Sequence, residues 1–413
     1  MKTEIITIGN ELLNGSTPDT NATWIADQLW CAGIRTERIV TIGDESQEIR
    51  DALRQSLDRA QIILVTGGLG PTHDDITKKS VADFFNLPLV ENLVLRQKIE
   101  ERFAKRGIPM PKINLEQAWI PKGSKILPNK IGTAAGFSIQ REKKFCFVMP
   151  GVPSEMKGML RDSVLPFLQK KFGNETGNLF SLTIRTTGIY ESKLYEILSP
   201  VFEKHGEVQI ASLPHRFGVD LRLTASGNSR QEAEKKVTNV KDSIVAKIAA
   251  YVYEVGNRNL ENVVSELLKR RQATLAVAES CTGGLINHLF TNIPGSSDFL
   301  LGGVVAYENA VKINLLGVSR KTLEKFGAVS RETALEMAKG VQKATNSNCA
   351  ISTTGIAGPS GGTEEKPVGL VYIGVAVDDD VQIEKYIFHK ERMINKYRFA
   401  YAAMNLLRTK LLT

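Results

Sequence analysis

The sequence predicts an α/β protein made of two separate strand–helix domains joined by a small α+β module. Short, wholly apolar segments recur along the chain, as is typical of buried parallel strands, and glycine-rich turns and helices follow them. Between about residues 178 and 255 this alternation gives way to strand signals that flank helices. The 413 residues are enough for two to three domains, each with its own core.

Composition and charge are those of an ordinary globular protein. The apolar fraction is 42%, the charged fraction is 24%, and the formal net charge is +8. That charge suits an anionic substrate but is too diffuse to argue for nucleic acid. No run of about 18 apolar residues predicts a transmembrane helix, no signal-peptide cleavage site follows the N-terminus, and the four cysteines form no C-x-x-C pair. We therefore expect a cytoplasmic protein with no membrane association.

The first domain is expected over residues 1–172 as a doubly wound α/β fold. Its predicted elements are a strand at 4–8, a helix at 21–30, a strand at 62–65, a helix at 75–85 and a strand at 145–149. Ser154 is predicted to cap a further helix, and residues 96–119 to form an inserted helix and loop.

The middle module is expected over residues 173–255, as a connector or a dimerisation module. Strands are predicted at 182–186, 219–224 and 251–253, and helices at 191–198 and 229–249. The segment lacks the G-x-x-G loop that a KH-type nucleic-acid domain would show, and its charges are mixed in sign.

The last domain is expected over residues 256–413, after a linker at 256–259, as a second α/β fold. The predicted elements are helix 260–269, strands 274–278, 304–306 and 348–352, a hairpin of 370–377 with 383–388, and a long terminal helix.

A glycine-rich loop follows the predicted strand at 62–65. Gly67, Gly68 and Gly70 allow the backbone to approach a phosphate or a pterin-like ligand closely. Asp74 and Asp75 follow, and they either hold a divalent cation or cap the next helix.

A second polar loop follows the strand at 4–8. It carries Asn10 and Glu11, and Asn21 begins the next helix. We expect both loops to open at the same edge of the sheet.

In the last domain, an apolar strand delivers Ser280 to a turn that continues through Cys281, Thr282, Gly283 and Gly284 into a helix. Free N–H groups at such a turn can hold a phosphate or a developing oxyanion. The alternative is that Ser280 or Thr282 caps the helix.

A nucleophilic serine needs a base. His288 is two helical turns away and is expected on the helix surface, and the hydrolase elbow G-x-S-x-G is absent. Lys312 follows a buried strand, and a partly desolvated lysine can lose its proton near neutral pH, although a solvated helix lysine is the alternative. A further polar loop, from Thr353 to Gly362, follows another buried strand.

Residues 257–413 contain three distinctive runs: A-E-S-C-T-G-G, V-A-Y-x-N-x-x-K and T-G-I-A-G-P-S-G-G-T-E-E-K-P-V-G. With these runs, the segment resembles the C-terminal domain of the CinA family and stand-alone nicotinamide mononucleotide deamidases. The resemblance implies hydrolysis of nicotinamide mononucleotide to nicotinate mononucleotide and ammonia, without a cofactor, by a dyad of Ser280 and Lys312. By the same resemblance, Tyr307 is a third catalytic residue, Thr354 is a polar residue of the site, and Arg392 matches the late basic residue. The expected substrate-binding residues of this domain are Cys281, Thr282, Gly283, Gly284, Asn309, Thr354, Gly355, Gly358 and Arg392.

The first domain contains the runs G-N-E-L-L-x-G, T-G-G-L-G-P-T-H-D-D-I-T and M-P-G-V-P-S-E-M. With these runs, it resembles the molybdopterin-binding-like domain that begins CinA proteins. Leu69 departs from the G-G-T-G loop of the molybdenum-cofactor proteins, which weakens the case for pterin. The resemblance implies an ADP-ribose pyrophosphatase dependent on Mg, Mn or Co. Its substrate-binding residues are expected to be Gly67, Gly68, Gly70, Asn10, Glu11 and Asn21, with Asp74 and Asp75 on the metal.

The leading hypothesis is a bifunctional hydrolase of pyridine-nucleotide salvage that acts on nicotinamide mononucleotide and ADP-ribose and forms a homodimer. One alternative is a binding module in which the N-terminal domain holds a nucleotide or pterin without reaction. The other is a competence or recombination partner, against which the scattered charges stand.

Overall fold

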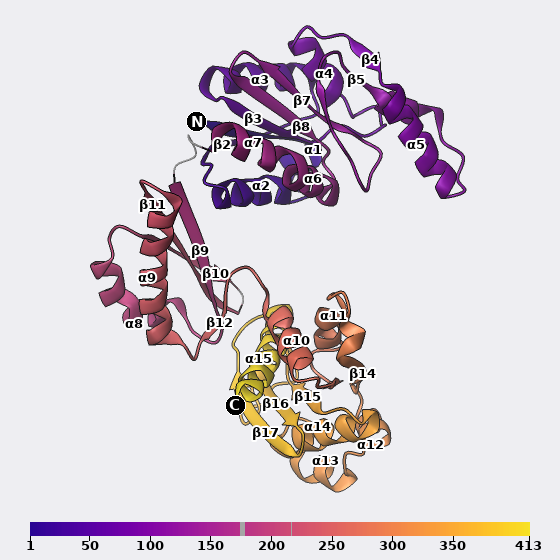
Figure 1. Ribbon diagram of the computed structural model, residues 1–413. Coiled ribbons are helices and arrows are strands. Elements are labelled where there is room, and N and C mark those ends of the chain that lie inside the picture. The colour runs from indigo at the N-terminus through magenta and orange to yellow at the C-terminus, as the bar shows by residue number, and fades with distance from the viewer. Residues whose placement is uncertain (174–177, 216) are drawn as a thin grey trace. The chain divides into compact units, whose positions relative to one another are not determined.

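The computed structural model describes residues 1–173, 178–215 and 217–413. The chain divides into two compact units, one of Met1–Ser181 with Ala225–Glu234 and one of Leu182–Thr224 with Lys235–Thr413. The division therefore runs through the predicted middle module. Figure 1 follows the chain from the indigo N-terminal domain to the yellow end of the C-terminal domain.

The N-terminal domain contains a six-stranded sheet in the order β2-β1-β3-β8-β7-β6. The first four strands are parallel, and β7 and β6 continue the sheet antiparallel. The strands are β1 (Thr3–Ile8), β2 (Thr36–Ile42), β3 (Ile62–Thr66), β6 (Lys125–Leu127), β7 (Gly136–Arg141) and β8 (Lys144–Met149). A separate antiparallel pair consists of β4 (Leu89–Glu91) and β5 (Trp119–Pro121).

Helices cover both faces of this sheet, as the alternation along its strands requires. Ile62 and Leu64 of β3 pack with α2 (Thr20–Cys31), α6 (Pro153–Met159) and α7 (Leu165–Phe172). Ile63 and Val65 pack with α3 (Ser46–Arg59) and α4 (Thr77–Phe84). Figure 1 shows these two groups of helices on opposite sides of the sheet. The predicted doubly wound fold is confirmed.

The helical segments of this domain are α1 (Asn10–Leu13), α2 (Thr20–Cys31), α3 (Ser46–Arg59), α4 (Thr77–Phe84), α5 (Leu93–Lys105), a 3-10 segment (Lys112–Ala118), α6 (Pro153–Met159), a π-helical turn (Leu160–Val164) and α7 (Leu165–Phe172). The prediction that Ser154 caps a helix is wrong. Pro153 is already the first helical residue, since its fixed φ suits that position, and Val152 is the N-cap.

The middle module has a four-stranded sheet in the order β10-β11-β9-β12. Its elements are β9 (Asn178–Thr186), α8 (Glu191–Lys204), β10 (Gln209–His215), β11 (Gly218–Gly227), α9 (Arg230–Ile248) and β12 (Val252–Val255). The sequence did not predict β10, whose side chains are mostly exposed. Within the second unit, the predicted linker at 256–259 is held in place, because the Arg185 guanidinium donates to the Arg258 carbonyl at 2.9 Å and to Asn259 Oδ1 at 2.6 Å.

The C-terminal domain contains a five-stranded sheet in the order β14-β13-β15-β16-β17. The strands β14 (Leu300–Val305), β13 (Leu275–Glu279) and β15 (Cys349–Gly355) are parallel. The predicted hairpin of β16 (Leu370–Val377) and β17 (Asp380–Ile387) continues the sheet antiparallel.

The helices of this domain again cover both faces of its sheet. Those that pack on one face are α10 (Leu260–Arg270), α11 (Leu285–Thr291) and the long α15 (Arg392–Leu412). The opposite face is covered by α12 (Asn309–Leu316) and α14 (Arg331–Thr345), with α13 (Arg320–Phe326) beside α14. No helix within the described ranges is long and apolar enough to cross a membrane.

Candidate functional sites

Three parallel strands of the C-terminal sheet end at one edge, and the predicted site residues follow them. Ser280 comes directly after β13, Tyr307 comes two residues after β14, and Gly355 ends β15. Open α/β sheets bind ligands at the carboxyl ends of their strands.

A cavity of about 250 Å³ lies at this edge. The predicted residues that line it are Ser280, Cys281, Tyr307, Asn309, Lys312, Thr354, Gly355, Gly358 and Arg392. Thr282, Gly283 and Gly284 are not part of its lining. Thr282 is buried behind the turn, where its hydroxyl is 2.8 Å from that of Thr353.

The turn that carries Ser280 is fixed by backbone and side-chain hydrogen bonds. The Ser280 N–H donates to the Thr353 carbonyl at 2.9 Å. The fully buried Glu279 carboxylate accepts the N–H groups of Ile286 and Asn287 at the start of α11, at 3.1 and 2.9 Å. Glu279 therefore satisfies the helix N-terminus, and neither Ser280 nor Thr282 caps it.

Sequence reasoning missed the role of Glu279. A signal was present, because a carboxylate at the end of an apolar strand and before a glycine-rich helix start is suited to bind free helical N–H groups. The position of His288 was predicted correctly, since its side chain is exposed on α11.

Lys312 is 1% exposed, in the first half of α12. Its Nζ donates to the carbonyls of Ala306 and Tyr307 at 2.8 and 3.0 Å. No carboxylate forms an ion pair with it among the residues that the structure describes. Burial lowers the pKa of Lys312, because the low-dielectric surroundings disfavour the charged amine. The alternative of a solvated helix lysine is wrong.

Cys281, next to Ser280, is the rival nucleophile. Burial raises the pKa of its thiol to about 12, so the thiolate is scarce near neutral pH. Cys281 and Ser280 are buried to a similar degree, at 6% and 9% exposed. The raised pKa of the thiol is therefore the observation that favours Ser280.

Arg392, the first residue of α15, connects the last helix to the pocket. Its guanidinium donates to the Gly358 carbonyl at 2.7 Å and to the Tyr307 hydroxyl at 3.3 Å. The Thr354 hydroxyl donates to the Ala328 carbonyl at 2.6 Å, which ties β15 to the opposite wall.

In the N-terminal domain, the carboxyl ends of β1, β2, β3 and β8 surround a cavity of about 630 Å³. The predicted residues in its lining are Asn10, Glu11, Gly67, Gly68, Gly70, Asp74 and Asp75. The sequence did not single out Asp44 or Glu155, which also line it, because their proximity depends on the fold of distant segments.

Asn21 lies in a smaller neighbouring cavity of about 110 Å³ that shares Glu11 and Gly67 with the first. Its amide donates to the Gly151 carbonyl at 2.7 Å. Gly67 has a φ of 118°, and a Cβ there would lie 2.1 Å from the Ile8 carbonyl oxygen. Only glycine fits at this point.

The two predicted metal ligands differ in their surroundings. The Asp75 carboxylate accepts the N–H and the hydroxyl of Thr72 at 2.9 and 2.6 Å, whereas Asp74 pairs with the exposed His73 at 2.8 Å. Neither is the side-chain cap of α4, whose N-cap is Ile76. Lys78 lies nearby, and burial lowers its pKa to about 8.

Comparison with known proteins gives three matches along the chain. Residues 257–411 match the CinA C-terminal domain, residues 4–170 the "Probable molybdopterin binding domain", and residues 181–253 the "Damage-inducible protein CinA KH domain". A CinA-like protein of Chloroherpeton thalassium is 47% identical, over 99% of each chain. The chain belongs to the CinA family.

Further relatives carry names that refer to competence and DNA damage. A protein of Thermoanaerobacter pseudethanolicus, named for competence-damage induction, is 42% identical over 100% of this chain and 99% of its own. The crystal structure of the competence/damage inducible protein CihA from Agrobacterium tumefaciens is 38% identical over 37% of this chain and 94% of that chain, with a TM-score of 0.36.

The match of the middle module corrects one inference. Absence of the G-x-x-G loop counted against a KH-type domain, yet the segment belongs to the KH type of this family. The four-stranded sheet with two helices is present without the loop that grips nucleic acid in other KH domains.

Proposed function

We propose that this CinA protein is a bifunctional hydrolase of pyridine-nucleotide salvage. The C-terminal pocket hydrolyses nicotinamide mononucleotide to nicotinate mononucleotide and ammonia. The N-terminal pocket hydrolyses ADP-ribose to AMP and ribose 5-phosphate. The observation that carries the first activity is a buried lysine, Lys312, that lines one cavity with Ser280.

Lys312 serves as the base. A neutral amine has two hydrogens, and the two carbonyls within 3.0 Å of Nζ accept both. The lone pair of the amine is then left to take the proton of the Ser280 hydroxyl. The Ser280 oxygen forms a bond to the carboxamide carbon, and the electrons of the carbonyl move to its oxygen.

The turn supports the remaining steps. The Cys281 N–H, next to the nucleophile, is the proposed hydrogen-bond donor to the oxyanion. The C–N bond then breaks, the Lys312 ammonium protonates the nitrogen, and ammonia leaves an ester on Ser280. Water cleaves this ester by the same proton transfers in reverse and releases the carboxylate.

Arg392 supplies the charge that recognises the substrate phosphate. It is the exposed cation of a pocket whose other basic residue, Lys312, is buried. The glycines of the 355–361 loop allow the backbone to approach the same phosphate. This arrangement favours a mononucleotide over free nicotinamide.

Because the N-terminal pocket is acidic, a cation is needed for a pyrophosphate to bind in it. Its lining holds five carboxylates and no lysine, arginine or histidine; the carboxylates are Glu11, Asp44, Asp74, Asp75 and Glu155. No group of three or more His, Cys, Asp or Glu that could hold a metal alone occurs in the described part of the chain. The residues fit a cation that binds together with the substrate, because Mg²⁺ is commonly held by one or two carboxylates plus phosphate oxygens.

Asp74 or Asp75 would hold that cation, with Mg, Mn and Co as the candidate metals. The metal would neutralise the charge that builds on the pyrophosphate oxygens. Because Gly67, Gly68 and Gly70 have no side chains, the backbone of this loop can approach the phosphates closely.

Two assays on the purified full chain test these proposals. Ammonia release from nicotinamide mononucleotide should proceed in EDTA, and AMP formation from ADP-ribose should require added divalent metal. If ADP-ribose binds tightly but no AMP forms with any of the added metals, the N-terminal domain is a binding module and not an enzyme. Absence of ammonia release would refute the deamidase.

A further inference from the structure

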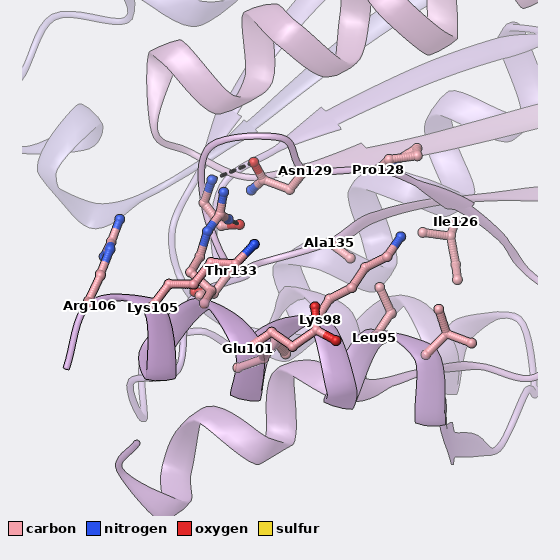
Figure 2. Close-up of a pocket in the computed structure, with 14 residues that line it drawn as sticks. Leu95, Lys98, Glu101, Lys105, Arg106, Ile126, Pro128, Asn129, Thr133 and Ala135 are labelled. Atoms are coloured by element: carbon pink, nitrogen blue, oxygen red, sulfur yellow. Dashed lines mark hydrogen bonds between the residues drawn. The ribbon is translucent and has the colours of Figure 1, made fainter. Parts of the chain in front are cut away.

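A further cavity, of about 460 Å³, lies beside the N-terminal pocket (Figure 2). Helix α5 forms one side, and residues 126–135 form the other. We call this cavity the α5 groove. Thr133 lines both the α5 groove and the acidic pocket. The two cavities are therefore neighbours.

The α5 groove is basic where the N-terminal pocket is acidic. Its lining includes Lys98, Arg102, Lys105 and Arg106 against the single carboxylate of Glu101, which gives four positive charges minus one, a net +3. In Figure 2, Lys105 extends from α5 toward Thr133, and Lys98 extends toward Ala135 and Ile126.

Most of this positive charge is uncompensated. Lys98, Lys105 and Arg106 form no ion pair among the described residues. The Arg102 guanidinium instead donates to the carbonyls of Lys130 and Gly132, and so attaches α5 to the opposite wall.

The wall between the two cavities is held from both sides. The Asn129 amide donates to the Ala134 carbonyl at 2.9 Å and to Glu155 at 2.6 Å. Asn129 Oδ1 accepts the N–H groups of Ile131 and Gly132 at 3.1 and 2.7 Å. Binding in the α5 groove therefore does not have to order this loop first.

The α5 groove also has an apolar side. Leu95 and Ile99 of α5 are buried at its base, and Ile126, Pro128 and Ala135 face them. An apolar strip bordered by cations fits a nucleobase carried by a phosphorylated sugar.

We propose that the α5 groove binds a 2′-phosphorylated adenosine, so that the N-terminal site takes 2′-phospho-ADP-ribose in preference to ADP-ribose. This inference rests on the proposed pyrophosphatase. With the pyrophosphate at the glycine loop, the 110 Å³ cavity at Asn21 suits a pentose. The 460 Å³ groove lies within the range of about 300–1,000 Å³ that ligand pockets occupy, and it suits adenosine.

The charge of the groove selects the extra phosphate. All charge of ADP-ribose lies on its pyrophosphate, so a groove of net +3 would face a neutral nucleoside. A phosphomonoester on the ribose adds about −1.5 to −2 at pH 7 and matches the lysines.

The reaction is the same hydrolysis on a different substrate. A water oxygen forms a bond to one phosphorus, and the bridging P–O bond breaks with its electron pair on the departing phosphate oxygen. The products are adenosine 2′,5′-bisphosphate and ribose 5-phosphate; one proton of the water is released to solvent and the other stays on the phosphate that the water attacks.

The test compares the double variant Lys98→Gln/Lys105→Gln with Lys122→Gln/Lys143→Gln in the full chain. The second variant loses the same charge from exposed lysines of the same domain that do not line the α5 groove. Two quantities are measured: kcat/KM for both nucleotides with Mg²⁺, Mn²⁺ or Co²⁺, and the Kd of adenosine 2′,5′-bisphosphate in EDTA by calorimetry.

We expect the wild type to prefer the 2′-phosphorylated substrate by about tenfold or more, and the groove variant to lose that preference while the control retains it. The bisphosphate should bind without metal, more weakly at high salt, and more weakly still to the groove variant. Equal kcat/KM values with unchanged bisphosphate binding in the groove variant would overturn the inference. Failure of the pyrophosphatase itself would appear separately, as no cleavage of either nucleotide; the EDTA binding would still decide whether the α5 groove holds the bisphosphate.

Discussion

Replacing Lys312 by arginine tests whether this buried lysine is a base or only a positive charge. Arginine keeps the charge, but its pKa above 12 makes it useless as a base near neutral pH. General-base catalysis is worth about 10²–10⁴ in rate. At about 1.36 kcal/mol per tenfold, that corresponds to roughly 2.7–5.4 kcal/mol of lost transition-state stabilisation.

The assay is ammonia release from nicotinamide mononucleotide, with Lys321→Arg on the exposed face of α13 as the control. We expect kcat of Lys312→Arg to fall by about 10²–10⁴ and to match that of Lys312→Met. An arginine variant that retains most of its activity would refute the base assignment and leave Lys312 as a charged contact.

The pH dependence gives a second readout of the same residue. Burial lowers the pKa of Lys312, so kcat/KM should rise with pH through a midpoint below the ordinary lysine value of about 10.4. Between the lowered folded pKa and the unfolded value, the unfolded chain binds more protons, so the free energy of unfolding rises with pH. In Lys312→Met this rise should be absent from urea titrations at a series of pH values.

Four further predictions concern other parts of the molecule. Ser280→Ala should lower kcat for deamidation by about 10³ or more, while Cys281→Ala, which removes a buried thiol, stays largely active. Glu279→Gln should destabilise the fold by about 2 kcal/mol in urea unfolding, because the amide is uncharged and its NH2 group cannot accept one of the two N–H groups at the start of α11. Asp75→Asn should abolish metal-dependent AMP formation and leave ammonia release intact, and EDTA should produce the same separation in the wild type. Residues 257–413 alone should fold and deamidate, since one sheet and its helices supply the core residues there apart from Tyr253 of the middle module.

Each of these has a result that contradicts it. Inactivation by thiol reagents that the substrate blocks would shift the nucleophile to Cys281. A Glu279→Gln variant as stable as the wild type would mean that water replaces the lost hydrogen bonds. Loss of both activities in EDTA would rule out the metal-free dyad, and an insoluble 257–413 fragment would show that the middle module is required for folding.

The sequence by itself determined the fold class and the order of the main elements. Wholly apolar segments such as 62–65 and 145–149 are buried on both faces, a pattern that identifies parallel strands without knowledge of their neighbours. It also placed Ser280 and Lys312 after strands, and parallel strands end at one edge. Local motifs were therefore sufficient to bring both residues to the same cavity.

Only the tertiary structure decided the environment of these residues. From the sequence alone, Ser280 in the turn at 280–284 could equally be a helix cap or a nucleophile. The buried carboxylate of Glu279 decides between them, because it accepts the N–H groups at the start of α11. Burial of Lys312 depends on α12 packing across β13 and β15, a contact between segments far apart in the chain. The acidic character of the N-terminal pocket likewise arises where distant loops meet, because Asp44, Asp75 and Glu155 come together from separate segments of the chain.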